Sequence, residues 1–265
     1  MNIQINTTYP SRYNYSPSFK TNNRVVKNLD SSVKWRNTTN FFRPDLQWKE
    51  MVDYFIKKYE NVDKVRVVCY ACSDGSEPTS LAMMLIDKLG EKADKFFPII
   101  AKDIDPEIIK KANSGKISIE HCDFDLIAGR LRKSVTNYLT IPPLLPTMHS
   151  VEATVNPQVR DSIHYTVADV RNDIDTIPEE NTIVFARNFW PYLRDKDEVF
   201  RQIQTLSQKL KQNGTLVIGN FDTFANIHEA LFCTGFRETL PNVYEIGTNL
   251  NNMPQRNFNV KKKSL

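Results

Sequence analysis

Apolar and polar residues alternate along the middle of this chain in blocks that predict a regular succession of strands and helices. A β-branched run over 64–70 predicts a strand. The next segment, 77–90, predicts a helix ending at Gly90, because glycine is common just past a helix C-terminus. The pattern repeats with a predicted strand over 96–102 and a predicted helix over 105–115. Two consecutive strand–helix units are typical of an α/β protein.

The second half of the chain continues the alternation. Three further apolar runs predict strands: 163–168, 182–187 and 214–219. An amphipathic helix is predicted over 193–211, between the last two of these strands. A helix over 223–233 and two short strands near 236–239 and 243–246 follow. Repeated strand–helix units favour a doubly wound, mostly parallel sheet, and the closing pair of strands suits an antiparallel edge hairpin.

Three segments fall outside this rhythm. Residues 1–36 are rich in Asn, Ser, Thr and Tyr without a clear period, so we interpret them as a partly ordered N-terminal arm. Residues 249–265 have the same character and are interpreted as a C-terminal tail. The predicted domain is therefore 37–248. Within it, 116–162 is an atypical, insertion-like segment with a predicted helix near 124–138 and a proline-rich loop.

Composition excludes several classes of protein. The net charge of +4 over 265 residues comes from basic residues gathered near the chain ends, which is not the dense patch of a dedicated nucleic-acid binder. Four cysteines do not make the framework of a disulfide-stapled secreted domain. No apolar stretch approaches the length of a membrane span. We therefore expect a cytoplasmic protein without membrane insertion.

Cysteine and histidine spacing gives no indication of a metal site. The Cys69-x-x-Cys72 pair has no second pair to complete a zinc site, and the histidines of the chain lack ligand spacing. Cys69 ends a predicted buried strand, so we interpret it as a small apolar residue. We expect no bound metal.

The turns after the first two predicted strands carry the candidate chemistry, because ligands of open α/β sheets bind at the carboxyl ends of the strands. The first turn, ACSDGSEP, has Gly75 as its only glycine and is not the GxGxxG fingerprint of dinucleotide-binding folds. The second strand is followed by Asp103, where an acid can accept hydrogen bonds from a ribose. Each signal alone is also compatible with an ordinary strand–helix–strand unit.

Five motifs in one order resemble those of the CheR family of chemotaxis-receptor methyltransferases. They are NTTNFFRP (37–44), YACSDGSEPTSLAM (70–83), KDIDPEIIKKANSG (102–115), VFARNFWPYL (184–193) and LKQNGTLVIGN (210–220). The resemblance covers residues 37 to about 246. It implies a Rossmann-like class I methyltransferase fold that uses S-adenosylmethionine as its cofactor.

The resemblance also implies roles for individual residues in binding the cofactor. The residues implied are Asn37, Thr39, Gly75, Glu77, Asp103, Asp169 and Asn188. Glu77 would lie near the ammonium group of the methionine moiety, Asp103 at the ribose and Asp169 near the adenine. Asn37 and Thr39 belong to the N-terminal motif, which would close over the cofactor and the acceptor as a lid.

The catalytic residues that the resemblance implies are Arg43, Arg187 and Tyr192. Methyl transfer is an in-line displacement that mainly needs alignment of the acceptor, but nitrogen and hydroxyl acceptors usually also need a base. No histidine lies in the five motifs. A carboxylate acceptor needs no base because it is already ionised at neutral pH, and the planar guanidinium groups of Arg43 and Arg187 suit it. We therefore expect O-methylation of a carboxylate such as a protein glutamate side chain.

The chain departs from the family pattern at several positions. Thr79 stands where the family usually has Tyr, and 219–222 reads G-N-F-D where G-H-S-E is usual. The family's helical N-terminal domain is reduced to the arm, and its small β-subdomain, which grips receptor tails, has no clear counterpart unless 116–162 is a reworked substitute. Two alternatives stay open: a methyltransferase of this fold acting on a small molecule or RNA, and a non-catalytic, cofactor-binding regulatory protein.

Overall fold

The computed structural model of the protein describes residues 25–27, 34–36, 39–143, 148–193, 195–225 and 227–247. From the predicted arm it describes one antiparallel pair of short strands, β1 (Val25–Lys27) and β2 (Lys34–Arg36). The predicted tail, 249–265, lies outside the described residues.

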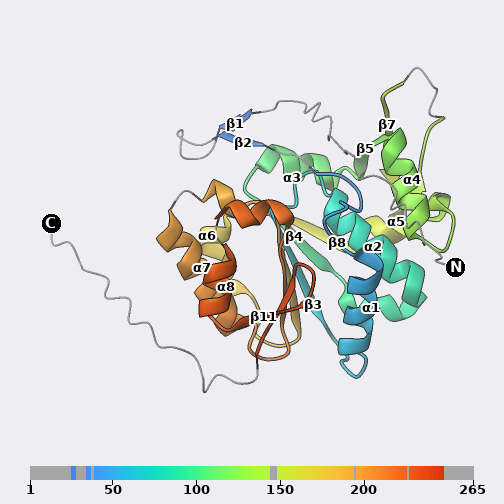
Figure 1. The fold of residues 1–265 in the computed structure, drawn as a ribbon. Helices are drawn as coiled ribbons and strands as arrows, with labels where there is room; N and C mark the ends of the chain where they lie inside the picture. Colours follow the sequence, from blue (N-terminus) through green and yellow to red (C-terminus); the bar gives the residue numbers. More distant parts are fainter. Residues whose placement is uncertain are drawn as a thin grey trace, which may run out of the picture.

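A seven-stranded sheet forms the centre of the molecule, with the strand order β11-β12-β10-β9-β3-β4-β8 (Figure 1). Its strands are β3 (Arg66–Tyr70), β4 (Ile99–Asp103), β8 (Ile163–Val167), β9 (Thr182–Ala186), β10 (Thr215–Val217), β11 (Phe236–Leu240) and β12 (Val243–Ile246). The run from β10 to β8 is parallel throughout, whereas β12 pairs antiparallel with both β10 and β11. The predicted mostly parallel sheet with an antiparallel edge hairpin is confirmed.

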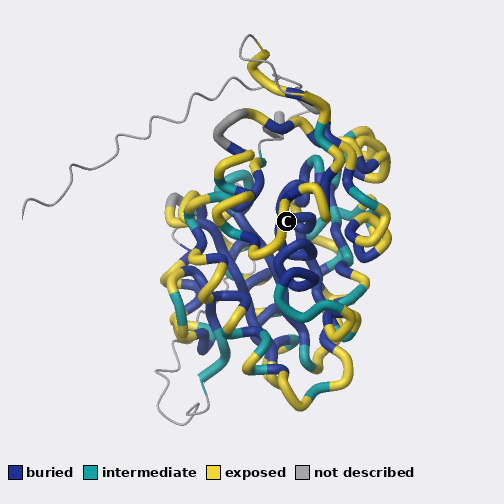
Figure 2. Tube along the Cα trace, turned by 90° about the vertical axis from the view of Figure 1, so that its right-hand side faces the viewer, coloured by how far each residue is buried: buried dark blue, intermediate teal, exposed yellow. Residues whose placement is uncertain are grey.

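Helices cover both faces of this sheet because successive strand residues point to opposite sides. Val67 and Cys69 belong to one hydrophobic cluster, and Val68 and Tyr70 belong to the other. The first cluster receives side chains from α1 (Trp48–Lys58), α2 (Ser76–Leu89) and α3 (Pro106–Asn113). The second receives them from α7 (Lys196–Lys209) and α8 (Ile227–Cys233). In Figure 2 the buried strands accordingly run through the centre, with exposed turns around them.

Helix α1 was missed by the sequence prediction although its pattern is regular. Its buried residues Trp48, Met51, Val52 and Phe55 recur at the three- and four-residue spacing of an amphipathic helix. The helix lies directly after the FFR motif and anchors that motif to the core. Short 3₁₀ turns complete the domain: η1 (Gly90–Phe96), η2 (Val135–Asn137), η3 (Ile174–Thr176), η4 (Trp190–Tyr192) and η5 (Asn220–Ala225).

The atypical segment contains a second, smaller sheet. Its antiparallel strand order is β5-β7-β6, and around it lie two helices; the bounds are β5 (Lys116–Glu120), α4 (His121–Arg130), β6 (Leu139–Thr140), β7 (Ser150–Val155) and α5 (Pro157–Arg160). Burial alternates strictly along β5 and β7, so one face of this sheet is buried. Ile117, Ala153 and Val155 join the same hydrophobic cluster as α1 and α2. The small sheet is therefore built into the main core.

The helix predicted near 124–138 was wrong beyond Arg130. Asp87, near the end of α2, accepts the backbone N–H groups of Arg132 and Lys133 at 2.9 and 3.0 Å and the hydroxyl of Tyr138 at 2.9 Å. Backbone donors that bond to a side chain in this way are not available to continue a helix. Leu131 is already extended, and only the 3₁₀ turn η2 follows.

Among the described residues, no helix combines the length and the apolar character required to cross a bilayer.

Phe55→Ala tests the anchoring of α1. The Phe55 ring is fully buried and packs edge-on against Phe185 of β9 at 6.2 Å between centroids. Its removal should lower the free energy of unfolding by about 3–5 kcal/mol in urea titrations. Phe124→Ala, at a ring that is 42% exposed on α4, is the control and should cost no more than about 0.5 kcal/mol. Similar losses in both variants would contradict this account of the core.

Candidate active site

The turn after β3 has an unusual backbone. Ala71, Ser73 and Gly75 have φ values of 51°, 51° and 90°, all in the left-handed region. Such a backbone is strained for residues other than glycine, and strain of this kind concentrates at functional sites. At Gly75 a side chain is also excluded by space, because a Cβ atom there would overlap the hydroxyl group of Tyr165 from β8. The turn therefore requires glycine at this position, as the start of α2.

Asp103 lies beside this turn at the end of β4. Its carboxylate accepts the backbone N–H of Ser73 at 2.9 Å and that of Asp105 at 3.0 Å. Burial raises the pKa of Asp103 in spite of these hydrogen bonds. A carboxylate has about four acceptor positions, so Asp103 keeps acceptor capacity for a ligand. It is held across the ends of two neighbouring strands, where the sequence predicts the ribose.

Arg187, directly after β9, is the centre of a buried charge cluster. Its guanidinium donates to Glu77 at the start of α2 and, at 2.5 Å, to Asp45, which lies before α1. The ring of Trp48 lies 5.9 Å from the guanidinium carbon. The residue as a whole is only 3% exposed, so its charge must be matched by neighbouring carboxylates.

The two carboxylates of this cluster differ in their pKa. Burial raises the pKa of Glu77, because desolvation outweighs the attraction of Arg187 and Arg43. Burial also acts on Asp45, but there Arg187, Arg43 and a hydrogen bond from the Asn220 N–H together lower the pKa. The arginine therefore has one firmly ionised partner, Asp45, and one whose charge is held less firmly, Glu77.

Arg43 stands on a fixed segment at the edge of this cluster. Phe41 and Phe42 just before it are fully buried, and the Phe42 N–H donates to Ser80 Oγ of α2 at 3.0 Å. The Arg43 carbonyl accepts from Trp48 Nε1 at 2.9 Å. These contacts hold Phe41, Phe42 and Arg43 against the core.

The loop after β9 is locked to the loop after β10. Asn188 has a φ of 61°, and its N–H donates to Asp222 at 2.8 Å. The same oxygen of Asp222 accepts from the Gly219 N–H at 2.7 Å, and the Asn188 side chain accepts from the Phe221 N–H at 3.2 Å. Burial raises the pKa of Asp222 to about 7. Asp222 therefore holds the backbone of Asn188, and the Phe221 N–H orients its side chain.

Most of the predicted site residues come together at this edge of the sheet. Gly75, Glu77, Asp103, Arg43, Arg187, Asn188 and Tyr192 all lie at the strand ends or on the segment packed against them. Tyr192, in η4, is half-buried with its ring 5.9 Å from that of Phe221. Thr39 is half-buried at the start of the same segment, and Asn37 lies outside the described residues.

Asp169 has a local partner that the sequence did not reveal. It is the N-cap of α6 (Val170–Asp173), and it accepts both from the Arg171 N–H at 3.0 Å and from the Arg171 guanidinium at 2.9 Å. Asp169 follows the carboxyl end of β8, on the side of the sheet where the sequence predicts the ligand. Its carboxylate is already bound by Arg171, so a role near the adenine stays a prediction.

Three polar atoms at this edge are buried without a hydrogen-bond partner in the described part of the chain: Arg187 Nε, Asn188 Nδ2 and Asp222 Oδ1. Buried polar groups are nearly always paired, by protein, water or ligand. The two nitrogen donors suit ligand groups with acceptor oxygens, such as carboxylates. Together with Asp103, this edge offers both donors and acceptors to a polar ligand.

Comparison with known protein families identifies the family of this chain. The chain matches the sequence model described as "CheR methyltransferase, SAM binding domain" over residues 37–239. It belongs to the CheR methyltransferase family. The Rossmann-like methyltransferase fold and S-adenosylmethionine as its cofactor, both predicted from the five motifs, are thereby confirmed.

Similar proteins include named chemotaxis enzymes. The chain is 24% identical over 213 residues to chemotaxis protein methyltransferase 2 of Vibrio cholerae, covering 77% of this chain and 68% of that protein. It is 26% identical over 201 residues to the chemotaxis protein methyltransferase of Escherichia coli, with coverage of 75% and 65%. The match thus spans about two thirds of each of these relatives. Among solved structures, a TehB-like SAM-dependent methyltransferase from Corynebacterium glutamicum matches with a TM-score of 0.39 and 10% identity, over 76% of this chain and 95% of that one.

Three residues of this CheR-family site were missed by sequence reasoning: Asp45, Trp48 and Asp222. Asp45 follows Arg43 by two positions, but its partner Arg187 is 142 residues away, so no local spacing marks it. Trp48 opens the helix that was not predicted. Asp222 was noted only as a departure from the G-H-S-E pattern, although an acid stands at that position in both patterns, which is the signal that could have identified it.

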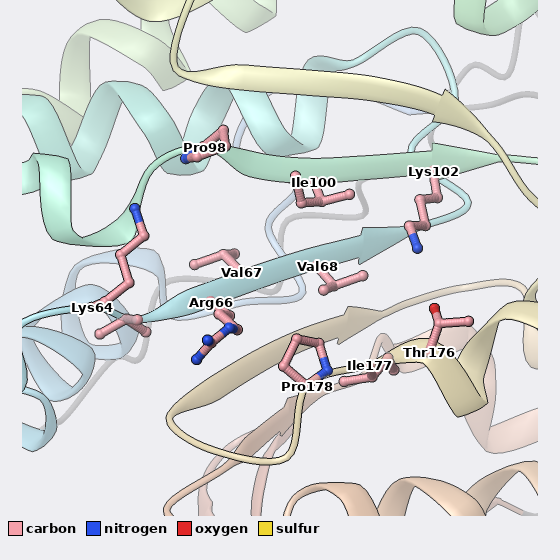
Figure 3. A pocket seen from close by; sticks show the side chains of 11 residues that line it. Lys64, Arg66, Val67, Val68, Pro98, Ile100, Lys102, Thr176, Ile177 and Pro178 are labelled. Carbon is pink, nitrogen blue, oxygen red and sulfur yellow. The ribbon is translucent and has the colours of Figure 1, made fainter.

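A separate groove of about 280 Å³ lies against β3, β4 and η3 (Figure 3). Its lining includes Lys64, Arg66, Val68, Ile100, Lys102 and Ile177. Lys64 donates to the Phe97 carbonyl and Lys102 pairs with Asp173 at 2.5 Å, so two of its cations already have partners. None of the predicted site residues lines it.

The pair Cys69 and Cys72 lies buried in the core near the site. Cys69 and Cys72 are buried and not joined by a disulfide, and burial raises the pKa of both thiols well above the usual value. Over the described ranges, no group of His, Cys, Asp and Glu side chains is placed to hold a metal ion.

Asp103→Ala tests the ribose assignment. The substitution removes acceptors for the ribose hydroxyls, so S-adenosylhomocysteine should bind more weakly by about 1–3 kcal/mol, or roughly 5- to 150-fold, in calorimetry. Asp161→Ala, at a carboxylate that is exposed and paired only with Arg160, should leave the affinity unchanged. A melting curve identifies any general loss of folding. Wild-type affinity in folded Asp103→Ala would refute the assignment.

Asp222→Asn tests the protonation of the buried carboxyl. A folded-state pKa of about 7 against 3.8 in the unfolded chain means that the protonated form stabilises the native state at low pH, and this contribution is lost as pH rises from about 4 to 7. The stability of wild type relative to Asp222→Asn should fall across that interval and stay level above it. Urea titrations at several pH values measure the difference. A flat difference would show that Asp222 is ionised throughout.

Proposed function

We propose that this CheR-family protein is an S-adenosylmethionine-dependent methyltransferase that O-methylates a carboxylate, with a protein glutamate side chain as the acceptor. The observation that carries the proposal is that the Arg43 guanidinium is unpaired within the described part of the chain. Among the described residues its guanidinium has no hydrogen bond or ion pair, yet it lies close enough to Asp45 and Glu77 to favour the ionised form of both. It is therefore a cation at the cofactor edge that is available to an anionic acceptor.

The residues of the site divide the work of holding both ligands. Asp103 would accept from the ribose, Glu77 would meet the ammonium group, and the unpaired Asn188 Nδ2 would donate to the amino-acid carboxylate. The unpaired Arg187 Nε would be left for the acceptor carboxylate. The bound cofactor supplies an electrophilic methyl group on sulfur. Arg43 would orient the acceptor carboxylate by paired hydrogen bonds without neutralising it.

The absence of a suitable base in the described site also favours this acceptor. His164 is exposed on β8, and His228 bonds to Tyr244 away from the cluster. Asp222 has a pKa near 7, which suits a base, but its side chain is 0% exposed. A carboxylate needs no deprotonation at neutral pH, whereas amine and hydroxyl acceptors usually do.

The small antiparallel sheet supports a protein acceptor. It lies in the segment considered above as a reworked counterpart of the family's β-subdomain, and we propose that it fills that place. Named relatives are chemotaxis protein methyltransferases, so a cytoplasmic protein substrate belongs to the same proposal.

The test uses amidated peptides with a central glutamate between residues randomised without Asp and Glu, and the same peptides with glutamine instead. Labelled methyl groups from S-adenosylmethionine should enter only the glutamate set and be released as methanol by mild alkali. Arg43→Ala should lower the rate roughly 10²-fold, because a misaligned acceptor loses that order of magnitude. Arg201→Ala is the matched control, since that side chain is 59% exposed and pairs with Glu198 on the surface of α7.

Label that resists alkali would overturn the ester and favour the small-molecule or RNA alternative. Tight binding of S-adenosylhomocysteine with no methyl transfer to any acceptor class would favour the regulatory alternative.

A further inference from the structure

Asp45 connects four parts of the chain that meet at the site. One carboxylate oxygen accepts from Arg187 at 2.5 Å, and the other accepts from the Asn220 N–H at 3.3 Å. The Asp45 carbonyl accepts from Asn242 Nδ2 at 2.9 Å, and the same nitrogen donates to Asn220 Oδ1 at 2.8 Å. The segment before α1 is thereby joined to the loops after β9 and β10 and to the turn between β11 and β12.

Arg187 has two carboxylate partners, Glu77 and Asp45. Glu77 is the residue proposed to meet the ammonium group, so its charge would be shared with the bound cofactor. Asp45 makes no contact assigned to the cofactor. Asp45 is therefore the partner that Arg187 would not share.

Asp45 and the neighbouring Trp48 also restrict the orientation of the Arg187 guanidinium. Arg187 Nη2 is held by Asp45, and the Trp48 ring lies 5.9 Å from the guanidinium carbon. Arg187 Nε is buried and has no hydrogen-bond partner among the described residues. A planar guanidinium held at one end and along one face has little freedom to rotate. Arg43 lies two residues before Asp45 on the same segment.

We propose that Asp45 is a positioning residue, which holds the Arg187 guanidinium in place independently of Glu77 and sets Arg43 beside it, so that both arginines face the acceptor. The inference rests on the proposed function for its consequence in catalysis. Its structural part, the immobilisation of Arg187, can be measured without any acceptor.

Asp45→Asn is the informative variant, because it keeps the shape and removes the charge. In protein with isotope-labelled arginine, the Arg187 Nε–H resonance should exchange with water about tenfold faster or more than in wild type, since a charge-assisted hydrogen bond is lost. The signal is assigned by its absence in Arg187→Lys. Asp53→Asn is the matched control: it removes a carboxylate that is 61% exposed and paired with Lys88, and it should leave the resonance and the activity unchanged.

Two further measurements separate positioning from general damage. The affinity for S-adenosylhomocysteine should change less than about threefold in Asp45→Asn, because Asp45 is not assigned to the cofactor. The kcat/KM for glutamate peptides should fall roughly 10²-fold, as expected when an orienting group is displaced.

The outcomes distinguish this inference from the proposed function. If wild type methylates glutamate peptides but Asp45→Asn retains wild-type exchange at Arg187 Nε, the positioning role is refuted and the function stands. If no glutamate peptide is methylated, the proposed acceptor fails, and fast exchange in Asp45→Asn would still support the role of Asp45 in holding Arg187. A large loss of S-adenosylhomocysteine affinity in Asp45→Asn would place Asp45 in cofactor binding instead and overturn the inference.

Discussion

The paired contacts of Arg187 with Glu77 and Asp45 join segments that are otherwise separate in the chain. Glu77 starts α2, Asp45 precedes α1, and Arg187 follows the central strand β9. A buried charge is tolerated only when it is matched, and removing one partner leaves the others uncompensated. The geometry of the cofactor edge therefore depends on three residues acting together, and Asp45 ties the segment that carries Arg43 to this edge.

The sheet is the rigid part of this arrangement, and the loops after its strands adopt strained backbone conformations. All five residues of β9 are buried, and β3 and β9 pair along their whole length. Immediately beyond these strands the backbone becomes left-handed at Ala71, Ser73 and Asn188. Such conformations persist only where the surroundings impose them. Here Asp103 holds Ser73 and Asp222 holds Asn188, so each buried carboxylate stabilises the loop next to it.

The sequence alone predicted the parts of the fold that depend on local pattern. Buried parallel strands appear as short apolar runs, and amphipathic helices such as α7 appear as a stripe, so the order of elements and the sheet type could be derived. The end of α4 could not, because it depends on Asp87, a side chain more than forty residues earlier in the chain. The ordered motifs predicted site residues at strand ends that the structure brings together. They did not reveal Asp45, since the resemblance assigns it no role and its contact with Arg187 is formed only in the folded chain. Sequence could likewise not show that Asp169 is bound by Arg171.

Helix α2 sets the distance between the cofactor edge and the small sheet. Glu77 lies in its first turn beside the cofactor edge. Asp87, near its other end, holds the segment that leads into β6 of the small sheet through Arg132, Lys133 and Tyr138. Ten residues of α-helix advance about 15 Å. Because a helix resists changes in length, α2 keeps the distance between Glu77 and Asp87 constant. A partner resting on the small sheet would have to span that distance with a tether of its own, and the length of that tether would decide which of its residues reaches the methyl group.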